Sequence, residues 1–186
     1  MLNGDKVTLR PMMKSDIERQ HEFNQDIHLY LLNAGLPQVS PLKRAQEMYE
    51  LCTKKDMNAQ HFAIEADEQY IGICSLKRLA AYPGVYRLGI MIGDRDYLGK
   101  GYGTDAVRVL LEYGFQYLGA RRIGLDTNAK NPRAINCFEK CGFVEEGRAR
   151  KVQWIDGEYT DLVTMGILRE EWERMEANKK QKGHQT

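Results

Sequence analysis

The chain has 186 residues, which is enough for one domain with a hydrophobic core and too few for two well-buried ones. Its 27 Lys and Arg residues and 26 Asp and Glu residues give a formal net charge of +1, so the overall charge indicates neither a nucleic acid nor an acidic membrane as partner. No apolar run has the length of a signal peptide or of a membrane span, and we therefore expect a cytoplasmic protein with no membrane or nucleic-acid partner.

The cysteines indicate neither disulfides nor a metal site. None of them forms a CxxC pair or belongs to a Cys/His ligand pattern. We expect all four to be reduced core thiols, and we expect no bound metal. They are Cys52, Cys74, Cys137 and Cys141.

The first elements are a short strand and a helix. Val7 to Arg10 alternates apolar and polar residues and ends at Pro11, a strand breaker. Ser15 and Glu18 then have the spacing of a capping box, which predicts a helix that ends at about Asn24. Residues 24–38 have a mixed character that predicts no element.

A second helix and a hairpin come next. Ser40 and Pro41 suit a helix start, and apolar residues then recur on one face. Strands are predicted over residues 61–66 and 70–79, joined by the polar turn 67–69. The apolar residues that predict the helix face are Leu42, Ala45, Met48, Tyr49 and Cys52.

The centre of the chain predicts a strand, a glycine turn and a helix. Residues 85–93 form the strand, whose nearly continuous apolar end at Leu88 to Ile92 indicates burial on both faces. After the glycines, apolar residues recur at helical spacing. These residues are Val107, Leu110, Leu111, Gly114 and Leu118.

The last part of the chain predicts a strand, a helix and a hairpin. Residues 123–127 form the strand, and the helix begins at Asn131 and Pro132 and ends before Gly142. Asp156 and Gly157 then lie between two extended runs, which is a hairpin signal. We expect one domain over residues 1–175, and a disordered Lys/Gln-rich tail over residues 176–186.

The glycine turn has the character of a phosphate site. Gly99, Gly101 and Gly103 alternate with other residues, so the backbone can turn tightly with its N–H groups pointing inward. The helix that follows adds unpaired N–H groups and a partial positive charge, and such a turn binds phosphate.

Two nucleotide-binding motifs do not fit this turn. A Rossmann fingerprint needs GxGxxG, whereas the order from Gly99 is GxGxG. A phosphate loop of the NTPase type needs Gly-Lys-Ser/Thr, but Lys100 is followed by Gly101.

A second motif points to a family. Asn131 to Phe143 follows one predicted strand and precedes another, and it matches the pattern Asn-x-x-Ala-x-x-x-Tyr-x-x-x-Gly-Phe except at Phe138. Leu98 to Gly103 matches Gln/Arg-x-x-Gly-x-Gly/Ala except at its first position. With these two motifs in order, the chain resembles the GNAT acetyltransferases, and more closely their RimJ/RimL-type branch, from Leu9 to the closing hairpin.

The resemblance implies a fold and a cofactor. The fold would be a single α/β (α+β) domain with a mixed, mostly antiparallel central sheet of about seven strands flanked by helices and splayed between the fourth and fifth strands. The cofactor would be acetyl-CoA, with coenzyme A as product. The acceptor would be a small-molecule amine or a protein N-terminal amine, and the assembly a monomer or a homodimer.

The resemblance also implies roles for individual residues. Met91, Ile92 and Gly93 would offer backbone groups to the pantetheine arm, with an N–H near Ile92 as donor to the developing oxyanion. The pyrophosphate would be wrapped by Leu98, Gly99, Lys100, Gly101, Tyr102, Gly103 and Thr104. Asn131 would hydrogen-bond the pantetheine arm, and Ala134 and Phe138 would line its path. Asn131 is also a suitable N-cap for its helix, and the two roles can coexist.

Three departures from the family leave the general acid and base unassigned. Leu98 replaces the polar residue at the start of the turn but keeps the backbone N–H groups. Phe138 occupies the usual Tyr position and cannot protonate a thiolate. Arg87 lies where many members carry a Glu. His21, His28 and His61 are candidate bases by residue type alone.

The absence of an assigned base favours a weakly basic acceptor. An amine with a pKa of about 10.4 is neutral in about one molecule in 2,500 at pH 7, which costs about 4.6 kcal/mol, whereas an α-amine costs only about 1 kcal/mol. We expect the acceptor between residues 24–40 and the closing hairpin, with contacts from Tyr30, Trp154, Glu158 and Tyr159. A polyamine or antibiotic acceptor and a non-catalytic acyl-CoA-binding module are the alternatives.

Overall fold

A computed structural model describes residues 1–33, 40–54 and 58–183 and contains one mixed sheet of eight strands in the order β1-β2-β3-β4-β5-β6-β8-β7. Only β5 and β6 are parallel. The predicted mixed sheet is confirmed, with eight strands because the two-residue β1 pairs with β2 and is too short to give a sequence pattern. The strands are β1 Leu2–Asn3, β2 Thr8–Arg10, β3 Ala59–Ala66, β4 Gln69–Arg78, β5 Val85–Ile92, β6 Arg122–Asn128, β7 Val144–Ile155 and β8 Glu158–Leu168.

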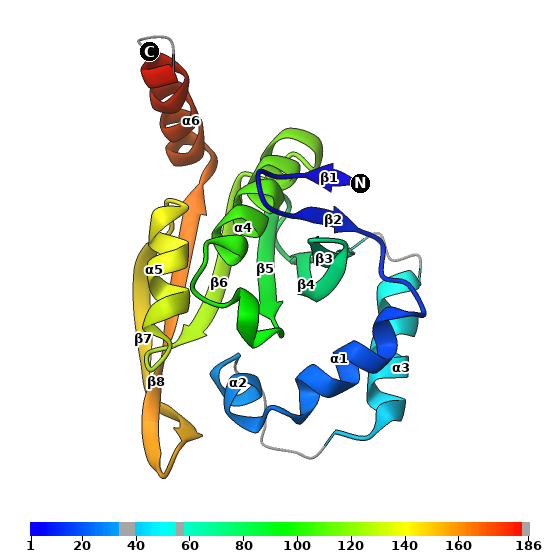
Figure 1. Ribbon diagram of the computed structural model, residues 1–186. Helices are drawn as coiled ribbons and strands as arrows, with labels where there is room; N and C mark the ends of the chain where they lie inside the picture. The colour runs from blue at the N-terminus through cyan, green and yellow to red at the C-terminus, as the bar shows by residue number, and fades with distance from the viewer. Residues whose placement is uncertain (34–39, 55–57, 184–186) are drawn as a thin grey trace.

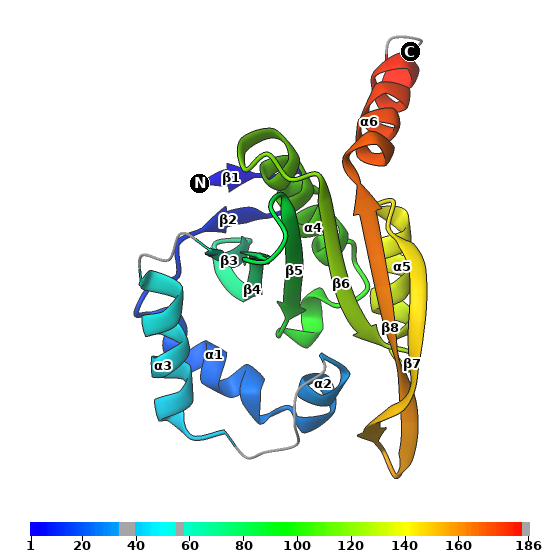
Figure 2. The same cartoon turned by 180° about the vertical axis from the view of Figure 1, so that it is seen from behind.

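The helices cover the sheet in two groups (Figures 1 and 2). α4 packs against β2, β4 and β5 and contacts α5, whereas α1 and α3 contact each other and pack against β4 and β3. The helices are α1 Asp16–Gln25, α2 Ile27–Leu32, α3 Leu42–Thr53, α4 Tyr102–Glu112, α5 Pro132–Lys140 and α6 Arg169–Gly183, with a 3-10 turn η1 Arg95–Tyr97 and a π-helical turn η2 Tyr113–Tyr117. Within the described part of the chain, no helix is long and apolar enough to cross a membrane.

The hydrophobic core lies on both faces of the sheet. Ala63 and Ile64 are consecutive in β3 and fully buried, yet they belong to different hydrophobic clusters. Because successive strand residues point to opposite faces, the two clusters lie on the two sides of the sheet. The larger contains Leu110 of α4, and the smaller contains Phe23 of α1.

Two predicted details differ from the structure. Ser15 has a helical backbone and makes no capping hydrogen bond, so the predicted capping box does not form. The reason is that an N-cap residue needs non-helical backbone angles, whereas Ser15 has φ −62° and ψ −19°. α6 extends past residue 175, where composition predicts a disordered tail.

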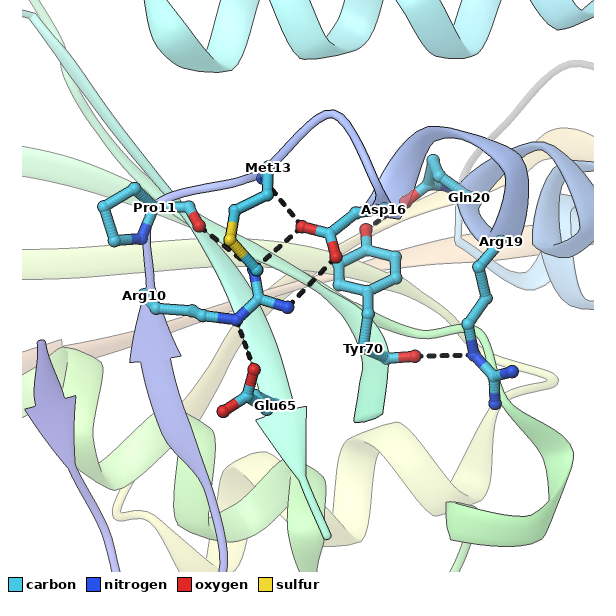
Figure 3. A network of polar contacts seen from close by, with 8 residues as sticks. All are labelled: Arg10, Pro11, Met13, Asp16, Arg19, Gln20, Glu65 and Tyr70. Carbon is cyan, nitrogen blue, oxygen red and sulfur yellow. Dashed lines mark hydrogen bonds and ion pairs between the residues drawn. The ribbon is translucent and has the colours of Figure 1, made fainter. Parts of the chain in front are cut away.

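A buried polar network attaches α1 to the sheet. The Arg10 guanidinium donates to Asp16 at 2.8 and 3.0 Å and to Glu65 at 2.5 Å (Figure 3). Tyr70 donates its hydroxyl to Gln20, and Gln20 donates to Asn24 at 2.8 Å. Burial and the nearby Asp16 carboxylate raise the pKa of Tyr70, so its hydroxyl stays a donor. The network fixes α1 over β4 and holds Asn24 beside the second cavity described below.

Candidate active site

The candidate active site begins where β5 and β6 stop pairing. Their parallel pairs run only from Val85 with Arg122 to Arg87 with Gly124, although both strands continue beyond these residues. Figure 2 shows the two ribbons diverging toward their carboxyl ends. A cavity of about 580 Å³ is lined by residues of both strands beyond this pairing, by the glycine turn, by α2 and by α5.

The alternation of backbone hydrogen bonds between β4 and β5 decides which backbone groups of β5 face this cavity. The N–H of Gly93 donates to the carbonyl of Ile71 at 2.9 Å. In an antiparallel ladder, bonded pairs alternate with pairs whose N–H and C=O point away. Ile92 lies opposite Gly72, one step from that bonded pair, so its N–H points away from β4 and toward the divergence from β6.

The glycine turn offers free backbone donors. Gly99 and Gly101 have φ values of 74° and 94°, which glycine adopts without strain. Gly101 is the N-cap of α4 and supplies no capping side chain. Among the backbone hydrogen bonds of the described residues, none starts from the N–H of residues 99–104. The N–H of Leu98, in contrast, donates to the Arg95 carbonyl at 3.2 Å.

Ion pairs and hydrogen bonds anchor both ends of this turn. Buried Asp105 accepts the N–H groups of Lys6 and Val7 at 2.7 and 3.0 Å, and the Lys6 amine donates to the Lys100 carbonyl at 2.9 Å. On the other side, Arg95 pairs with Asp26 at 2.7 Å. The turn is therefore held in shape between the N-terminal segment and α2.

The α5 residues contribute one cap and one apolar wall. Asn131 is 8% exposed, and its side-chain oxygen accepts the Ala134 N–H at 3.2 Å. The predicted N-cap role is confirmed, and the side-chain nitrogen keeps two N–H donors for another partner. Phe138 is buried and packs edge-on against Phe143 at 5.8 Å between ring centroids.

Most of the predicted cofactor residues come together around the cavity, and three do not. Gly93, Lys100 and Tyr102 are absent from its lining. The backbone of Gly93 is bonded to β4, and a Cβ there would come within 2.1 Å of the Phe23 ring, so this glycine allows α1 to pack closely. The predicted residues in the lining are Met91, Ile92, Leu98, Gly99, Gly101, Gly103, Thr104, Asn131, Ala134 and Phe138.

A second cavity of about 420 Å³ opens on the side of α1, α2 and α3. It shares Gly89, Ile90 and Met91 of β5 with the first cavity, so the two meet at this strand. Tyr30, a predicted acceptor residue, lines it, and its acceptor role stays a prediction. The other residues in its lining are Asn24, Asn33, Met48, Leu51, Cys52, His61, Ile73, Cys74 and Ser75.

The closing hairpin reaches α2, where Asp156 pairs with His28 at 3.3 Å. Trp154 and Tyr159 are 54% and 63% exposed and pack against each other at 4.8 Å between ring centroids. Glu158 pairs with Lys130. None of the three lines either cavity, so their acceptor role stays a prediction.

Comparison with known proteins identifies the family. The acetyltransferase (GNAT) domain matches residues 6–144. The chain belongs to the GNAT acetyltransferases. It is therefore an acetyl-CoA-dependent N-acetyltransferase, as the resemblance implied.

Relatives of different acceptor classes are similar to this GNAT chain. The spermidine N(1)-acetyltransferase of Vibrio cholerae is 28% identical over 91% of this chain and 96% of its own length. The putative ribosomal N-acetyltransferase YdaF of Bacillus subtilis is 31% identical over 91% and 95%. A crystal structure of the Vibrio cholerae spermidine N-acetyltransferase with CoA and spermine superposes with a TM-score of 0.79 at 26% identity, covering 90% of this chain and 98% of that chain. The RimJ/RimL-type branch stays a prediction.

Arg87 of this GNAT chain is paired with a carboxylate that the sequence did not indicate. It binds Asp126 of β6, which also accepts the Thr164 hydroxyl at 2.9 Å and lines the first cavity. Burial and the nearby Arg122 lower the pKa of Arg87. β5, which lacks the family's Glu, therefore carries Arg87, and Asp126 on the neighbouring β6 balances its charge.

Cys137 is a further cavity residue that sequence reasoning missed. Its sulfur accepts the Thr104 hydroxyl at 3.4 Å, and it lines the first cavity. A hydrogen bond from Cys141 lowers the pKa of Cys137 to about 7, against the opposing effect of burial. Its place one residue before Phe138, on the helix of the second motif, was the available signal.

Proposed function

We propose that this GNAT enzyme acetylates a primary amine, on a protein N-terminus or a small molecule, by direct attack of the neutral amine on the thioester. The observation that supports it is the continuity of the site. Free N–H groups at residues 99–104 lead along one cavity to Ile92, and a second cavity meets it at Gly89 to Met91.

The chain's own groups fit the cofactor. Acetyl-CoA supplies an activated acetyl group. In this proposal the N–H groups of residues 99–104 hold its pyrophosphate, with the start of α4 adding a partial positive charge. The Ile92 N–H donates to the thioester carbonyl and stabilises the oxyanion as it forms. The Asn131 amide holds the pantetheine arm, and Phe138 excludes water from it.

The proposed acceptor is a weakly basic amine because its proton must be lost before attack. At pH 7 deprotonation of an α-amine costs about 1 kcal/mol, whereas deprotonation of an alkyl amine with a pKa near 10.4 costs about 4.6 kcal/mol. A positioned pair of reactants then supplies much of the rate acceleration.

A polyamine acceptor is the second candidate, because the similar Vibrio cholerae enzyme is named a spermidine N(1)-acetyltransferase. Against it, the described residues that line the second cavity contain no Asp or Glu to face a polyamine's charges. An antibiotic acceptor is a further alternative within the same reaction class.

Thiol release from acetyl-CoA tests the proposal. The panel contains an alanyl peptide amide, 2-phenylethylamine, spermidine and an aminoglycoside, each beside a no-acceptor control. We expect the α-amine to give the highest kcat/KM. Highest turnover with spermidine would favour the second candidate. Tight acetyl-CoA binding without turnover of any amine would leave only an acyl-CoA-binding module.

A further inference from the structure

One row of side chains crosses the sheet beneath the second cavity. His61 of β3 lies opposite Ser75 of β4, and Ser75 lies opposite Gly89 of β5. Directly opposed residues point to the same face, with Cβ atoms about 4.5–5.5 Å apart. All three residues line the second cavity, so an imidazole and a hydroxyl lead to the strand on which the two cavities meet.

We propose that the second cavity binds the acceptor amine and that His61 accepts the amine's proton through the Ser75 hydroxyl. This inference rests on the proposed function and adds to it the acceptor site, the proton acceptor and a substrate class. Ser75 touches the amine, and His61 acts through Ser75.

Gly89 gives the amine access to Ser75. A Cβ at this position would lie 3.1 Å from the Ser75 hydroxyl oxygen, so a side chain there would cover the hydroxyl. Gly89 also lines both cavities. An amine placed over Gly89 therefore contacts Ser75 on one side and reaches the thioester beside Ile90 to Ile92 on the other.

The neighbouring rows supply no competing base. Toward the carboxyl end of β5 the adjacent row is Ala63, Ile73 and Met91, and on the other side it is Ala59, Lys77 and Arg87. Lys77 is exposed and Arg87 is paired with Asp126, so the near cations are solvated or neutralised.

Burial keeps the two thiols in the described part of the cavity wall uncharged. Tyr30 of α2, Cys52 of α3 and Cys74 of β4 share the cavity with His61. Burial raises the pKa of Cys52 to about 11 and raises the pKa of Cys74, so both thiols remain protonated near neutral pH. Tyr49 and Cys52 of α3 pack against the smaller hydrophobic cluster.

The polar and apolar side chains in the described part of this wall define the substrate class. The described part of the lining holds Asn24, Tyr30 and Asn33 as hydrogen-bonding groups and Met48, Leu51 and Ile73 as apolar ones. Such a wall suits a primary amine whose neighbouring atoms are apolar or uncharged. A polycation would enter it without a compensating carboxylate, which costs free energy.

Every proton in the proposed acetyl transfer is accounted for without a further reactant. The ammonium form gives one proton to Ser75, whose own proton passes to the His61 imidazole. The neutral nitrogen attacks the carbonyl carbon, so that the C–N bond forms and the C–S bond breaks. The second proton leaves the nitrogen for the thiolate, giving amide and thiol, and His61 returns its proton to solvent.

The test compares His61→Gln and Ser75→Ala with His21→Gln, a change of a histidine outside both cavities that bonds Gln25 on α1. Acetyl-CoA affinity is measured by calorimetry, the His61 titration by NMR, and thiol release from pH 5.5 to 9 with 2-phenylethylamine, an alanyl-phenylalanine amide and spermidine.

We expect all three variants to bind acetyl-CoA within twofold of the wild type. His61→Gln should lower kcat by roughly 100-fold at pH 7 and remove the acid limb of the pH profile. That limb should coincide with the pKa of His61 measured by NMR in the wild type. Ser75→Ala should lower kcat at least tenfold while His61 still titrates, and His21→Gln should leave rate and profile unchanged.

Three results would show whether the relay, the substrate class or the proposed function is wrong. An unchanged acid limb in His61→Gln, with wild-type turnover present, would overturn the relay and leave the proposed function intact. A kcat/KM for spermidine above those of both monoamines would overturn the substrate class. No turnover by the wild type with any amine, despite acetyl-CoA binding, would overturn the proposed function and the relay together.

Discussion

The N–H of Gly93 donates to the carbonyl of Ile71 at 2.9 Å, and this bond fixes the orientation of the backbone along the end of β5. It directs the polar groups of Met91 toward β4 and those of Ile92 away from it. A role for Gly93 as a cofactor donor is therefore incompatible with this ladder, whereas Ile92 is oriented for one.

Amide hydrogen exchange should report this alternation directly. We expect the Ile90 and Ile92 amides to exchange faster than that of Met91 in the free protein, because only the Met91 N–H is bonded to β4. Acetyl-CoA, whose thioester carbonyl would accept the Ile92 N–H, should then slow exchange at Ile92 most. Equal protection of the three amides without ligand would contradict the assigned phase of the ladder.

Gly101→Glu should abolish acetyl-CoA binding, because it puts a side chain and a negative charge at the N-cap of α4. Gly119→Glu is a matched control. It adds the same charge at another exposed glycine with positive φ, 66°, outside both cavities. Calorimetry should show a loss of affinity of at least 100-fold in the first variant only. Equal affinity in both would refute the phosphate cradle.

Asn131 can be tested for its two roles separately. Asn131→Ala removes the cap and should cost about 1 kcal/mol of unfolding free energy together with cofactor affinity. Asn131→Asp keeps an oxygen that caps α5 but has no N–H to donate. We expect it to keep the wild-type Tm and to bind coenzyme A at least fivefold more weakly. If its affinity is unchanged, Asn131 serves only as a helix cap.

Cys137 should be the reactive thiol of the free enzyme. A hydrogen bond from Cys141 lowers the pKa of Cys137 to about 7, whereas burial raises the pKa values of Cys52 and Cys74. Its thiolate fraction therefore grows as the pH rises through about 7, and alkylation by iodoacetamide should accelerate over the same interval and level off above it.

Two controls belong to that experiment. Cys137→Ser should remove the fast-reacting thiol, and saturating coenzyme A should protect it, because Cys137 lines the first cavity beside Thr104. A fast-reacting thiol that survives in Cys137→Ser would show that another cysteine carries the reactivity.

Local patterns predicted the glycine turn and the Asn131 helix cap. The alternating glycines and the Asn131 cap depend on neighbours a few residues away, so their geometry can be inferred from spacing. The Asp156-Gly157 hairpin is likewise local, and both residues adopt the expected positive φ.

Relationships between distant strands could not be predicted in this way. The row of His61, Ser75 and Gly89 depends on the register of three strands. The pairing of Arg87 with Asp126 depends on which strands are neighbours in the sheet. The hairpin residues Trp154 and Tyr159, which we expected to contact the acceptor, lie outside the cavity that Tyr30 lines.

The most direct test of the central claim is a crystal structure with coenzyme A bound. We expect the pyrophosphate oxygens within about 2.7–3.2 Å of backbone nitrogens of residues 99–104, and the sulfur beside Ile92 and Phe138. A pyrophosphate bound away from this turn, or a thiol end outside the meeting point of the two cavities, would contradict it.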